Sequence, residues 1–348
     1  MPSIDYFQER VQAAAADKKP LRIRGGGTKD WYGQRFDGEI LDTRGYSGIV
    51  DYEPTELVIT ARCGTPLAEI EARLAERQQM LAFEPPHFGP GATLGGAIAA
   101  GLAGPRRASS GGVRDFVLGA KLLDGKGEVL NFGGQVMKNV AGYDVSRLLA
   151  GSLGTLGLLL EVSVKVLPRP VAQTTLRIAI GEVDAIRMLN QWGGQPLPVS
   201  GSCWYQDCLW VRLAGAGAAV DAAVHGIGGD FVQDCDAFWA SVRDQRHGFF
   251  AGEEALWRLS VPSTTGALVL GGEQLIEWGG AQRWLRTGLD AATIRSTVSA
   301  IGGHATLFRG GDKACGVFQP LQPGIARIHQ RLKASFDPAN VFNPGRMY

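Results

Sequence analysis

The sequence is poor in cysteine, in net charge and in long apolar runs. Its 348 residues include five cysteines at irregular spacing and no C-x-x-C pair, which argues against a zinc site and a disulfide framework. A formal net charge of +1 gives no reason to expect nucleic acid as a partner. No apolar run reaches the roughly 18 residues of a membrane span, and the first residues lack the basic and apolar regions of a secretory signal. We therefore expect a cytoplasmic protein with reduced thiols.

Two common nucleotide-binding motifs are also absent. The chain contains no G-x-x-x-x-G-K-[ST] string, which a Walker-type phosphate loop requires. Gly89-x-Gly91 resembles the start of the Rossmann fingerprint G-x-G-x-x-G, but its third glycine is out of register. Neither motif explains the glycine content of the chain.

Glycine is abundant and concentrated. The stretch from Gly89 to Gly157 is a fifth of the chain, yet it holds 17 of the 49 glycines. Its turns read GPGATLGG, GGVRD and GSLGTLG, and a fourth turn, RGGGTK, begins at Arg24. Glycine permits positive φ and a close approach of ligand to backbone. Hydroxyl groups accompany the turns at Thr28, Thr93, Ser152 and Thr155. Such turns predict a backbone-lined groove that suits a pyrophosphate held by neutral donors.

Composition and pattern divide the chain into three parts. Residues 1–170 alternate strand and helix patterns and end at Pro168-Arg-Pro170, a break typical of a domain boundary. Residues 171–324 hold seven of the eight tryptophans and two βαβ-like passes, which predict a compact α+β layer with its own core or interface. Residues 325–348 begin with an amphipathic helix and end in a proline- and glycine-punctuated tail. We expect no internal repeat.

Local patterns predict individual elements. Thr65 is expected to cap a helix that starts at Pro66, and Thr93 to cap a helix of small residues. Asp124-Gly-Lys-Gly127 predicts a hairpin turn between two strands. In the tryptophan-rich part, the patterns favour a strand over 267–270 and helices over 183–192 and 279–285.

The ordered set of motifs resembles the FAD-binding domain of the vanillyl-alcohol oxidase, or p-cresol methylhydroxylase (PCMH), family. The set runs RGGGT, GPGATLGG, GGVRDFVLGAKLLDGKGEVL and GGQVMKNVAGYDVSRLLAGSLGTLGLLLEVSVKVLP, and closes with FDPANVFNPGRMY. The tail NPGRMY, the stretch GGHATLFRGG and the chain length resemble the FAD-binding subunits of bacterial glycolate oxidases (glycolate dehydrogenases). The resemblance implies an α+β fold. A PCMH-type FAD-binding domain of two α/β subdomains would span 1–170 and a smaller α+β cap 171–324. The tail, 325–348, would return to the FAD-binding domain.

The resemblance also implies cofactor contacts, position by position. The turn from Arg24 to Lys29 would form the pyrophosphate loop, the turn at 91–96 would wrap the other side, and residues 100–104 would lie along the flavin. Residues 153–157 would contact ribose and adenine, and Asn343 would approach the isoalloxazine ring. The implied FAD contacts are Arg24, Gly25, Gly26, Gly27, Thr28, Lys29, Gly91, Ala92, Thr93, Gly95, Gly96, Ala100, Gly101, Gly104, Gly154, Thr155, Gly157 and Asn343.

Departures from the family pattern limit which properties of the family are implied for this chain. Gly27-Thr28-Lys29 carries no histidine where many relatives attach the flavin, so non-covalent FAD is implied. Leu153 stands where the GSEGTLG motif has its acidic residue. The H-x-G-D-G-N-x-H-like and E-H-G segments, which bind metal and substrate carboxylate in related 2-hydroxy-acid oxidases, are missing. The five histidines show no metal-ligand spacing, so no metal is expected.

Few side chains offer a catalytic group. His304, between an expected strand and an expected helix, is a candidate for a substrate-facing base. A structural histidine in a turn is the simpler interpretation, so the catalytic group stays unknown. Other side chains that allow both a functional and a structural interpretation are Arg106, Arg107, Tyr143, Asp144, Arg309 and Lys313.

By resemblance, the chain is implied to be the FAD-binding subunit of a glycolate oxidase complex. Such a complex oxidises glycolate (and D-lactate) to the 2-keto acid and passes electrons to an iron–sulfur subunit and then to quinone. The implied partners are a second flavoprotein subunit, the iron–sulfur subunit and a small 2-hydroxy acid. The implied location is the cytoplasm or, through the partners, the periphery of the inner membrane.

Two alternatives to this function stay open. Because the metal- and carboxylate-binding segments are missing, the partner flavoprotein could perform the substrate step. The chain could also be a stand-alone FAD oxidoreductase for another alcohol or hydroxy acid, or a structural subunit with little catalysis of its own.

Overall fold

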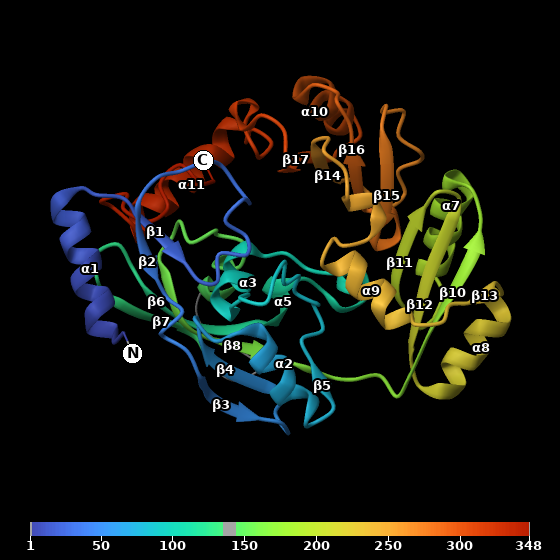
Figure 1. The fold of residues 1–348 in the computed structure, drawn as a ribbon, viewed down its shortest axis with the longest axis horizontal. Helices are drawn as coiled ribbons and strands as arrows, with labels where there is room; N and C mark the ends of the chain where they lie inside the picture. The colour runs from blue at the N-terminus through green and yellow to red at the C-terminus, as the bar shows by residue number, and fades with distance from the viewer. Residues whose placement is uncertain (1, 135–143, 348) are drawn as a thin grey trace. The chain divides into compact units, whose positions relative to one another are not determined.

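The computed structural model describes residues 2–134 and 144–347, which form two compact units (Figure 1). The first unit comprises Met1–Leu102, Gly111–Pro168 and Pro320–Tyr348, and the second comprises Ala103–Ser110 and Arg169–Gln319. Both units mix helices and strands, as expected from the sequence. The segment Ala103–Ser110, expected in the first domain, instead packs with the second unit.

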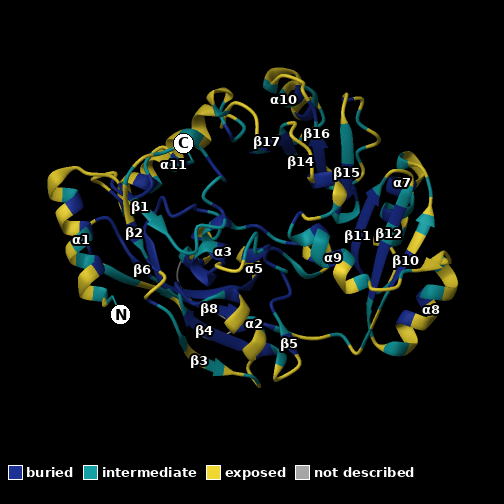
Figure 2. Cartoon of the chain, in the orientation of Figure 1, coloured by how far each residue is buried: buried dark blue, intermediate teal, exposed yellow. Residues whose placement is uncertain are grey.

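An antiparallel sheet forms the main layer of the first unit. Its strand order is β3 (Ile49–Glu53), β4 (Val58–Arg62), β8 (Leu158–Lys165), β6 (Val117–Leu123) and β7 (Val129–Gly133). The central strands β4, β8 and β6 are buried along almost their whole length (Figure 2). The helices of this part are α2 (Leu67–Ala75), α3 (Leu94–Ala100), α5 (Val113–Phe116) and α6 (Val145–Leu148), and the short strands β5 (Gln79–Met80) and β9 (Leu167–Pro168) pair with each other.

A second, smaller sheet joins the two ends of the chain. Strand β1 (Leu21–Arg24) pairs in parallel with β2 (Glu39–Asp42). The C-terminal tail lies along the other side of β1, because Leu21 N donates to Val341 O at 2.7 Å and Asn343 N donates to Leu21 O at 2.9 Å. Helices α1 (Ile4–Asp17) and α11 (Pro323–Phe336) complete this first unit. The tail is thereby held against the edge of this two-stranded sheet by an isolated parallel bridge.

Two helix starts expected from sequence have different outcomes. Thr93 caps α3 as predicted, and its hydroxyl accepts from Gly96 N at 3.3 Å. The prediction for Thr65 is wrong, since α2 begins at Leu67 without a side-chain cap. The Thr65 hydroxyl instead accepts from Gly48 N at 2.9 Å and donates to Gly48 O at 3.1 Å. Hydrogen bonds to the loop at Gly48 therefore replace the helix cap that the local sequence predicted for Thr65.

The predicted hairpin at 124–127 is confirmed. It connects β6 to β7, and Asp124 Oδ1 accepts from Lys126 N at 2.9 Å and from Glu128 N at 2.8 Å. The carboxylate therefore stabilises the turn from within.

The second unit is one eight-stranded sheet made of two halves with the same strand order. The strands lie in the order β13 (Asp230–Phe231), β10 (Ala172–Ala179), β12 (Cys208–Gly215), β11 (Val199–Tyr205), β15 (Glu273–Glu277), β16 (Gln282–Arg286), β14 (Leu256–Ser260) and β17 (His304–Arg309). When the strands of each half are numbered in chain order, they lie side by side in the order fourth, first, third, second. The two halves meet at their second strands, β11 and β15, which pair with each other. The sequence showed no such repeat. All neighbouring pairs are antiparallel. Strands β10 and β11, which α7 (Glu182–Gly193) links, are therefore parallel with β12 between them, and β12 and β13, which α8 (Gly217–Ile227) links, are parallel with β10 between them. The two expected βαβ-like passes are confirmed as split βαβ units.

Helices cover one face of each half. In the first half, α7 (Glu182–Gly193) and α8 (Gly217–Ile227) supply residues to one apolar core. In the second half, α10 (Ala291–Ala300) packs in a separate apolar core with β14, β16 and β17. The remaining helices of the unit are α4 (Arg107–Ser110), α9 (Cys235–Arg243) and the 3₁₀ turns η1 (Gly248–Phe250), η2 (Trp278–Gly280) and η3 (Lys313–Cys315). Trp204 and Trp257 belong to the two cores, so part of the tryptophan enrichment is structural.

The two halves differ in one connection. Helix α7 joins the first two strands of the first half, whereas residues 261–272, between β14 and β15, are described throughout and form no helix. Arg283, with no exposed surface, binds this loop: its Nη1 donates to Gly266 O at 2.8 Å and its Nη2 donates to Thr265 O. The expected strand at 267–270 is therefore absent. The expected helix at 279–285 is wrong as well, because residues 282–286 form β16 between β14 and β15.

Candidate cofactor-binding site

An open cavity of about 740 Å³, a volume that includes the solvent at its mouth, lies in the first unit. Thirteen of the eighteen implied FAD contacts line it, and the five outside the lining are Gly91, Ala92, Gly101, Gly104 and Thr155. The glycine turns that are dispersed in the sequence are thus brought together at one cavity.

The turns touch each other so closely that side chains would not fit. A Cβ atom on Gly26 would lie 1.5 Å from Gly91 O, and one on Gly25 would lie 2.4 Å from Thr93 Oγ1. Gly91 therefore packs against the RGGGTK turn and is not among the residues that line the cavity. The absence of side chains leaves backbone groups of the turn at the cavity surface, as a bound anion requires.

The RGGGTK turn begins where β1 ends and is held by an ion pair. Asp30 Oδ2 accepts from Arg24 Nε at 2.7 Å and also lies 2.9 Å from Arg22 Nη2. Gly27 takes a φ of 73°, a conformation that favours glycine. Lys29 is largely buried, and its Nζ lies 3.4 Å from His87 O, to which it donates.

The GSLGTLG turn forms another part of the cavity lining. Leu153 and Gly154 both have positive φ, 52° and 71°. Leu153 N donates to Ala99 O at 2.8 Å, which ties the turn to α3. Leu153, the departure from the family motif, is buried and lines the cavity. Thr155 is outside the lining, and its hydroxyl donates to Ser152 O at 2.7 Å.

Asn343 closes the cavity from the C-terminal tail. Its Oδ1 accepts from Ile23 N at 2.9 Å, and its Nδ2 donates to Leu153 O at 2.6 Å. The side chain lines the cavity while both ends of its amide bind backbone. Asn343 therefore positions β1 against the GSLGTLG turn.

A buried ion pair holds the tail in this place. Lys333 Nζ donates to Thr155 O at 2.7 Å, to Phe342 O at 2.8 Å and to the carboxylate of Asp337. Asp337 in turn accepts from the N–H groups of Val341 and Phe342, at 3.0 and 2.8 Å. Desolvation lowers the pKa of Lys333, and the neighbouring Asp337 opposes this shift. One ammonium group thus connects the GSLGTLG turn, α11 and the tail.

Several cavity residues were missed by the reasoning from sequence. Arg346 is largely buried, lines the cavity and donates from Nη2 to Lys29 O at 3.2 Å and to Tyr32 O at 3.3 Å. Desolvation lowers its pKa to about 10, so it stays charged at neutral pH. The sequence signal for Arg346 is its position in the tail motif NPGRMY, two residues after Pro344. Asp30, Tyr32, Thr43 and Cys63 also line the cavity.

The cavity offers little for covalent attachment of a flavin. Among its described lining residues there is no histidine. Cys63 is the lining thiol, and desolvation raises its pKa to about 12, so it is protonated and a poor nucleophile at neutral pH. These residues fit a cofactor that is held without a covalent bond.

The remaining implied contacts have structural surroundings. Gly101 ends α3 with a φ of 64°, and a Cβ there would lie 2.7 Å from Gly151 Cα. Ala92 O accepts from Leu67 N at 2.9 Å. Gly104 belongs to the second unit, where its carbonyl accepts from Trp278 Nε1 at 3.1 Å.

The basic pair beside Gly104 also packs in the second unit. Arg106 Nη2 donates to Gln173 Oε1 at 3.0 Å, and the Arg107 guanidinium lies 4.5 Å from the centre of the Trp278 ring. These contacts favour the structural interpretation of the pair. Tyr143 lies outside the described residues, and Asp144 pairs with Arg147 at 2.9 Å.

The candidate base His304 lies in the second unit. It begins β17 and follows α10, so the expected order of strand and helix around it is wrong. Desolvation, and then the charge of Arg258, lower its pKa. Arg309, on the same strand, donates to Gln245 Oε1, and its pKa is lowered by desolvation. Lys313 begins the turn η3.

The described residues show neither a metal site nor a membrane-spanning helix. Within residues 2–134 and 144–347, no group of three or more His, Cys, Asp or Glu side chains is placed to hold a metal ion. In the same residues, no helix combines the length and the apolar character that crossing a membrane requires.

Comparison with known proteins identifies the class. Residues 2–133 match the FAD binding domain family. The solved structure of p-cresol methylhydroxylase with substrate bound superposes with a TM-score of 0.72 at 14% identity, over 99% of this chain and 87% of that chain. The protein is an FAD-dependent oxidoreductase of α+β fold with a PCMH-type FAD-binding domain. The predicted cofactor and fold class are confirmed.

Closer relatives identify the family. Glycolate oxidase subunit GlcE of Escherichia coli (strain K12) is 51% identical over 347 residues, which are 99% of this chain and 98% of that protein. The chain belongs to this family of glycolate oxidase subunits, and the resemblance seen in the sequence is confirmed. Glycolate oxidase subunit GlcD of Bacillus subtilis (strain 168) is 31% identical over 183 residues, 52% of this chain and 39% of that protein.

Proposed function

We propose that this chain is the FAD-holding subunit of a complex that oxidises glycolate, or a related small 2-hydroxy acid, to the 2-keto acid. The observation that carries the proposal is the closure of one cavity by the two glycine turns and Asn343 from the tail. The relatives support the substrate and the complex, since two of them are glycolate oxidase subunits.

The residues of the cavity suit a non-covalent dinucleotide. The backbone of Gly25–Thr28 and the hydroxyl of Thr93 would hold the pyrophosphate, and Gly154 and Gly157 would face ribose and adenine. The Thr93 oxygen accepts from Gly96 N, which leaves its hydroxyl hydrogen to donate to a ligand. FAD, when bound, supplies the capacity to accept a hydride equivalent.

The substrate step belongs to a partner in this proposal. Asp30, the carboxylate in the cavity lining, is bound to two arginines, and the Cys63 thiol is protonated. Neither group is suited to accept a proton from a hydroxy acid. A second flavoprotein subunit would therefore oxidise the substrate, and this chain would relay electrons toward an iron–sulfur subunit. The complex would lie in the cytoplasm or at the periphery of the inner membrane.

Purification of the chain alone and with its partners tests the proposal. The isolated chain should be yellow, carry about one FAD per chain and keep its colour when glycolate is added without oxygen. The complex should contain an iron–sulfur protein and lose its flavin absorbance on addition of glycolate. Glycolate bleaching of the isolated chain would favour a stand-alone oxidoreductase, and a colourless chain that cannot be loaded with FAD would favour a structural subunit.

A further inference from the structure

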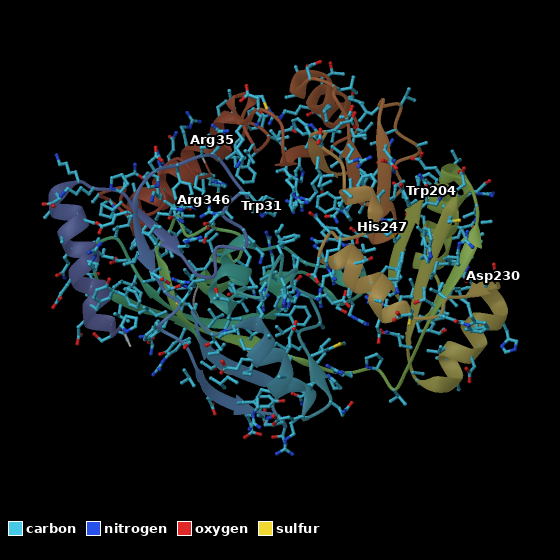
Figure 3. The ribbon with its side chains drawn as sticks, viewed as in Figure 1. Trp31, Arg35, Trp204, Asp230, His247 and Arg346 are labelled. Carbon is cyan, nitrogen blue, oxygen red and sulfur yellow. The ribbon has the colours of Figure 1, made fainter. Side chains whose placement is uncertain are left out.

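Two arginines converge on one aromatic ring beside the cavity. The guanidinium carbons of Arg22 and Arg346 lie 5.4 and 4.8 Å from the centre of the Phe36 ring. The Nε atom of each arginine is buried, and neither has a hydrogen-bond partner among the described residues. Figure 3 labels Arg346. A buried N–H group without a partner is costly, so two of them side by side point to a ligand.

The charges around this ring do not balance. Arg22 and Arg24 both bind Asp30, at 2.9 and 2.7 Å, and Arg346 also interacts with the charges of Asp30 and Arg22. Asp30 is thus shared by three guanidinium groups. Asp42, which also interacts with Arg24, is paired with Arg44, so positive charge is in excess in this group. Asp30, Arg24 and Arg346 line the cavity, so the excess charge reaches its surface.

We propose that Arg346 binds the diphosphate of FAD directly, opposite the backbone of the turn at Gly25–Thr28, and that Arg22 and Arg24 complete the positive end of the site. A diphosphate bridge carries one negative charge on each phosphate, which suits a site with an excess of positive charge. The planar guanidinium fork suits phosphate oxygens better than an ammonium group does. The inference rests on the proposed function, because its ligand is the proposed cofactor.

The proposal couples the cofactor to the C-terminal tail. Arg346 and Asn343 both come from the tail, and Arg346 also holds the RGGGTK turn through Lys29 O. A ligand that binds Arg346 stabilises the docked tail by the free energy of that contact. Inorganic pyrophosphate should therefore slow the removal of the last residues of the apo-protein by a carboxypeptidase.

The test uses the full chain freed of flavin. We expect R346Q to bind FAD and inorganic pyrophosphate about 10- to 100-fold more weakly than wild type, the loss typical of a hydrogen bond to a charged group. R346K keeps the positive charge but not the planar guanidinium group, so its affinities should lie between those of wild type and R346Q. The control R187Q removes an exposed arginine of the second unit that pairs with Asp184 and should bind both ligands as wild type does. Flavin fluorescence gives the FAD affinity and calorimetry gives the pyrophosphate affinity.

The outcomes separate this inference from the proposed function. Equal affinities in R346Q and R187Q overturn the inference, even if R346Q melts at a lower temperature, since that result leaves Arg346 a structural role only. If R346Q does not fold, the affinities of R346K test the inference. Wild-type affinity of R346K for both ligands would then overturn the inference. A wild-type chain that binds pyrophosphate through Arg346 but no FAD contradicts the proposed function and leaves the anion site standing.

Discussion

The side-chain nitrogen of Asn343 donates to the carbonyl oxygen of Leu153 at 2.6 Å, across 190 positions of the sequence. The same amide accepts from Ile23 N. The N-terminal strand, the GSLGTLG turn and the C-terminal tail are therefore joined at one buried side chain. Asn343 has a φ of 43°, and asparagine tolerates this region better than most residues.

Replacing Asn343 by aspartate tests this junction. N343D keeps the shape and the acceptor for Ile23 N, but it removes the donor and brings a carboxylate to the Leu153 carbonyl. We expect a loss of about 1–3 kcal/mol in the free energy of unfolding and weaker FAD binding. Denaturant unfolding and flavin titration measure the two effects, and wild-type values for both would contradict the role of the junction.

Replacing Gly26 by alanine tests the close contact of the two glycine turns. The added Cβ would lie 1.5 Å from Gly91 O, so backbone must move, with a cost of about 1–3 kcal/mol and the loss of most bound FAD. Gly226 in α8 is a matched control, because a Cβ there meets nothing within 4 Å. G226A should keep its flavin and gain up to about 1 kcal/mol of stability. Flavin content after purification is the first measurement, and a fully loaded G26A would contradict the prediction.

The buried Lys333 predicts both a stability effect and its pH dependence. K333M leaves Asp337 and the carbonyls of Thr155 and Phe342 without their ammonium partner, which should cost about 3–5 kcal/mol at neutral pH. Because the folded-state pKa of Lys333 is lowered below 10.5, the unfolded chain binds more protons between the lowered pKa and 10.5.

Stability contributed at this position therefore rises as pH increases through that window. The difference in unfolding free energy between wild type and K333M should grow from neutral pH toward pH 10. Denaturant unfolding at several pH values checks the sign, and a difference that shrinks would show that the ammonium has a raised pKa instead.

Arg283 predicts the stability of the second unit. R283M leaves Glu182 and the carbonyls of Thr265 and Gly266 unpaired in a buried place, which should cost about 3–5 kcal/mol. R187M removes an exposed arginine that pairs with Asp184 on the same helix as Glu182 and should change stability by less than about 0.5 kcal/mol. Tryptophan fluorescence follows this unit, and equal effects of the two changes would sink the prediction.

Local sequence predicted elements well where one segment contains its own signal. Helix α7 spans Glu182–Gly193, close to the expected 183–192, because its apolar spacing lies within a single helix face. The expected helix at 279–285 failed since residues 282–286 are paired on both sides by strands β14 and β15. Its apolar residues suit a buried strand as well as a helix, and only the distant partners decide between them.

The residues of the cavity also divide into those that the local sequence predicted and those that it did not. The glycine turns were predictable, because positive φ and close backbone contact leave few other residues acceptable. Arg346, Asp30 and Cys63 were not, because they come from separate elements and meet only at the cavity. The hydrogen bonds of Asn343 were not predicted for the same reason, since its partners Ile23 and Leu153 are distant in sequence.

The sequence by itself determined the family, the cofactor and the glycine turns that line the cavity, because glycine spacing and turn chemistry act over a few residues. The tertiary structure alone decided the two matching halves of the second sheet, the buried lysine and arginines, and the closure of the cavity by the tail. Those features depend on pairing and desolvation between residues far apart along the chain, and such energies exist only after the chain has folded.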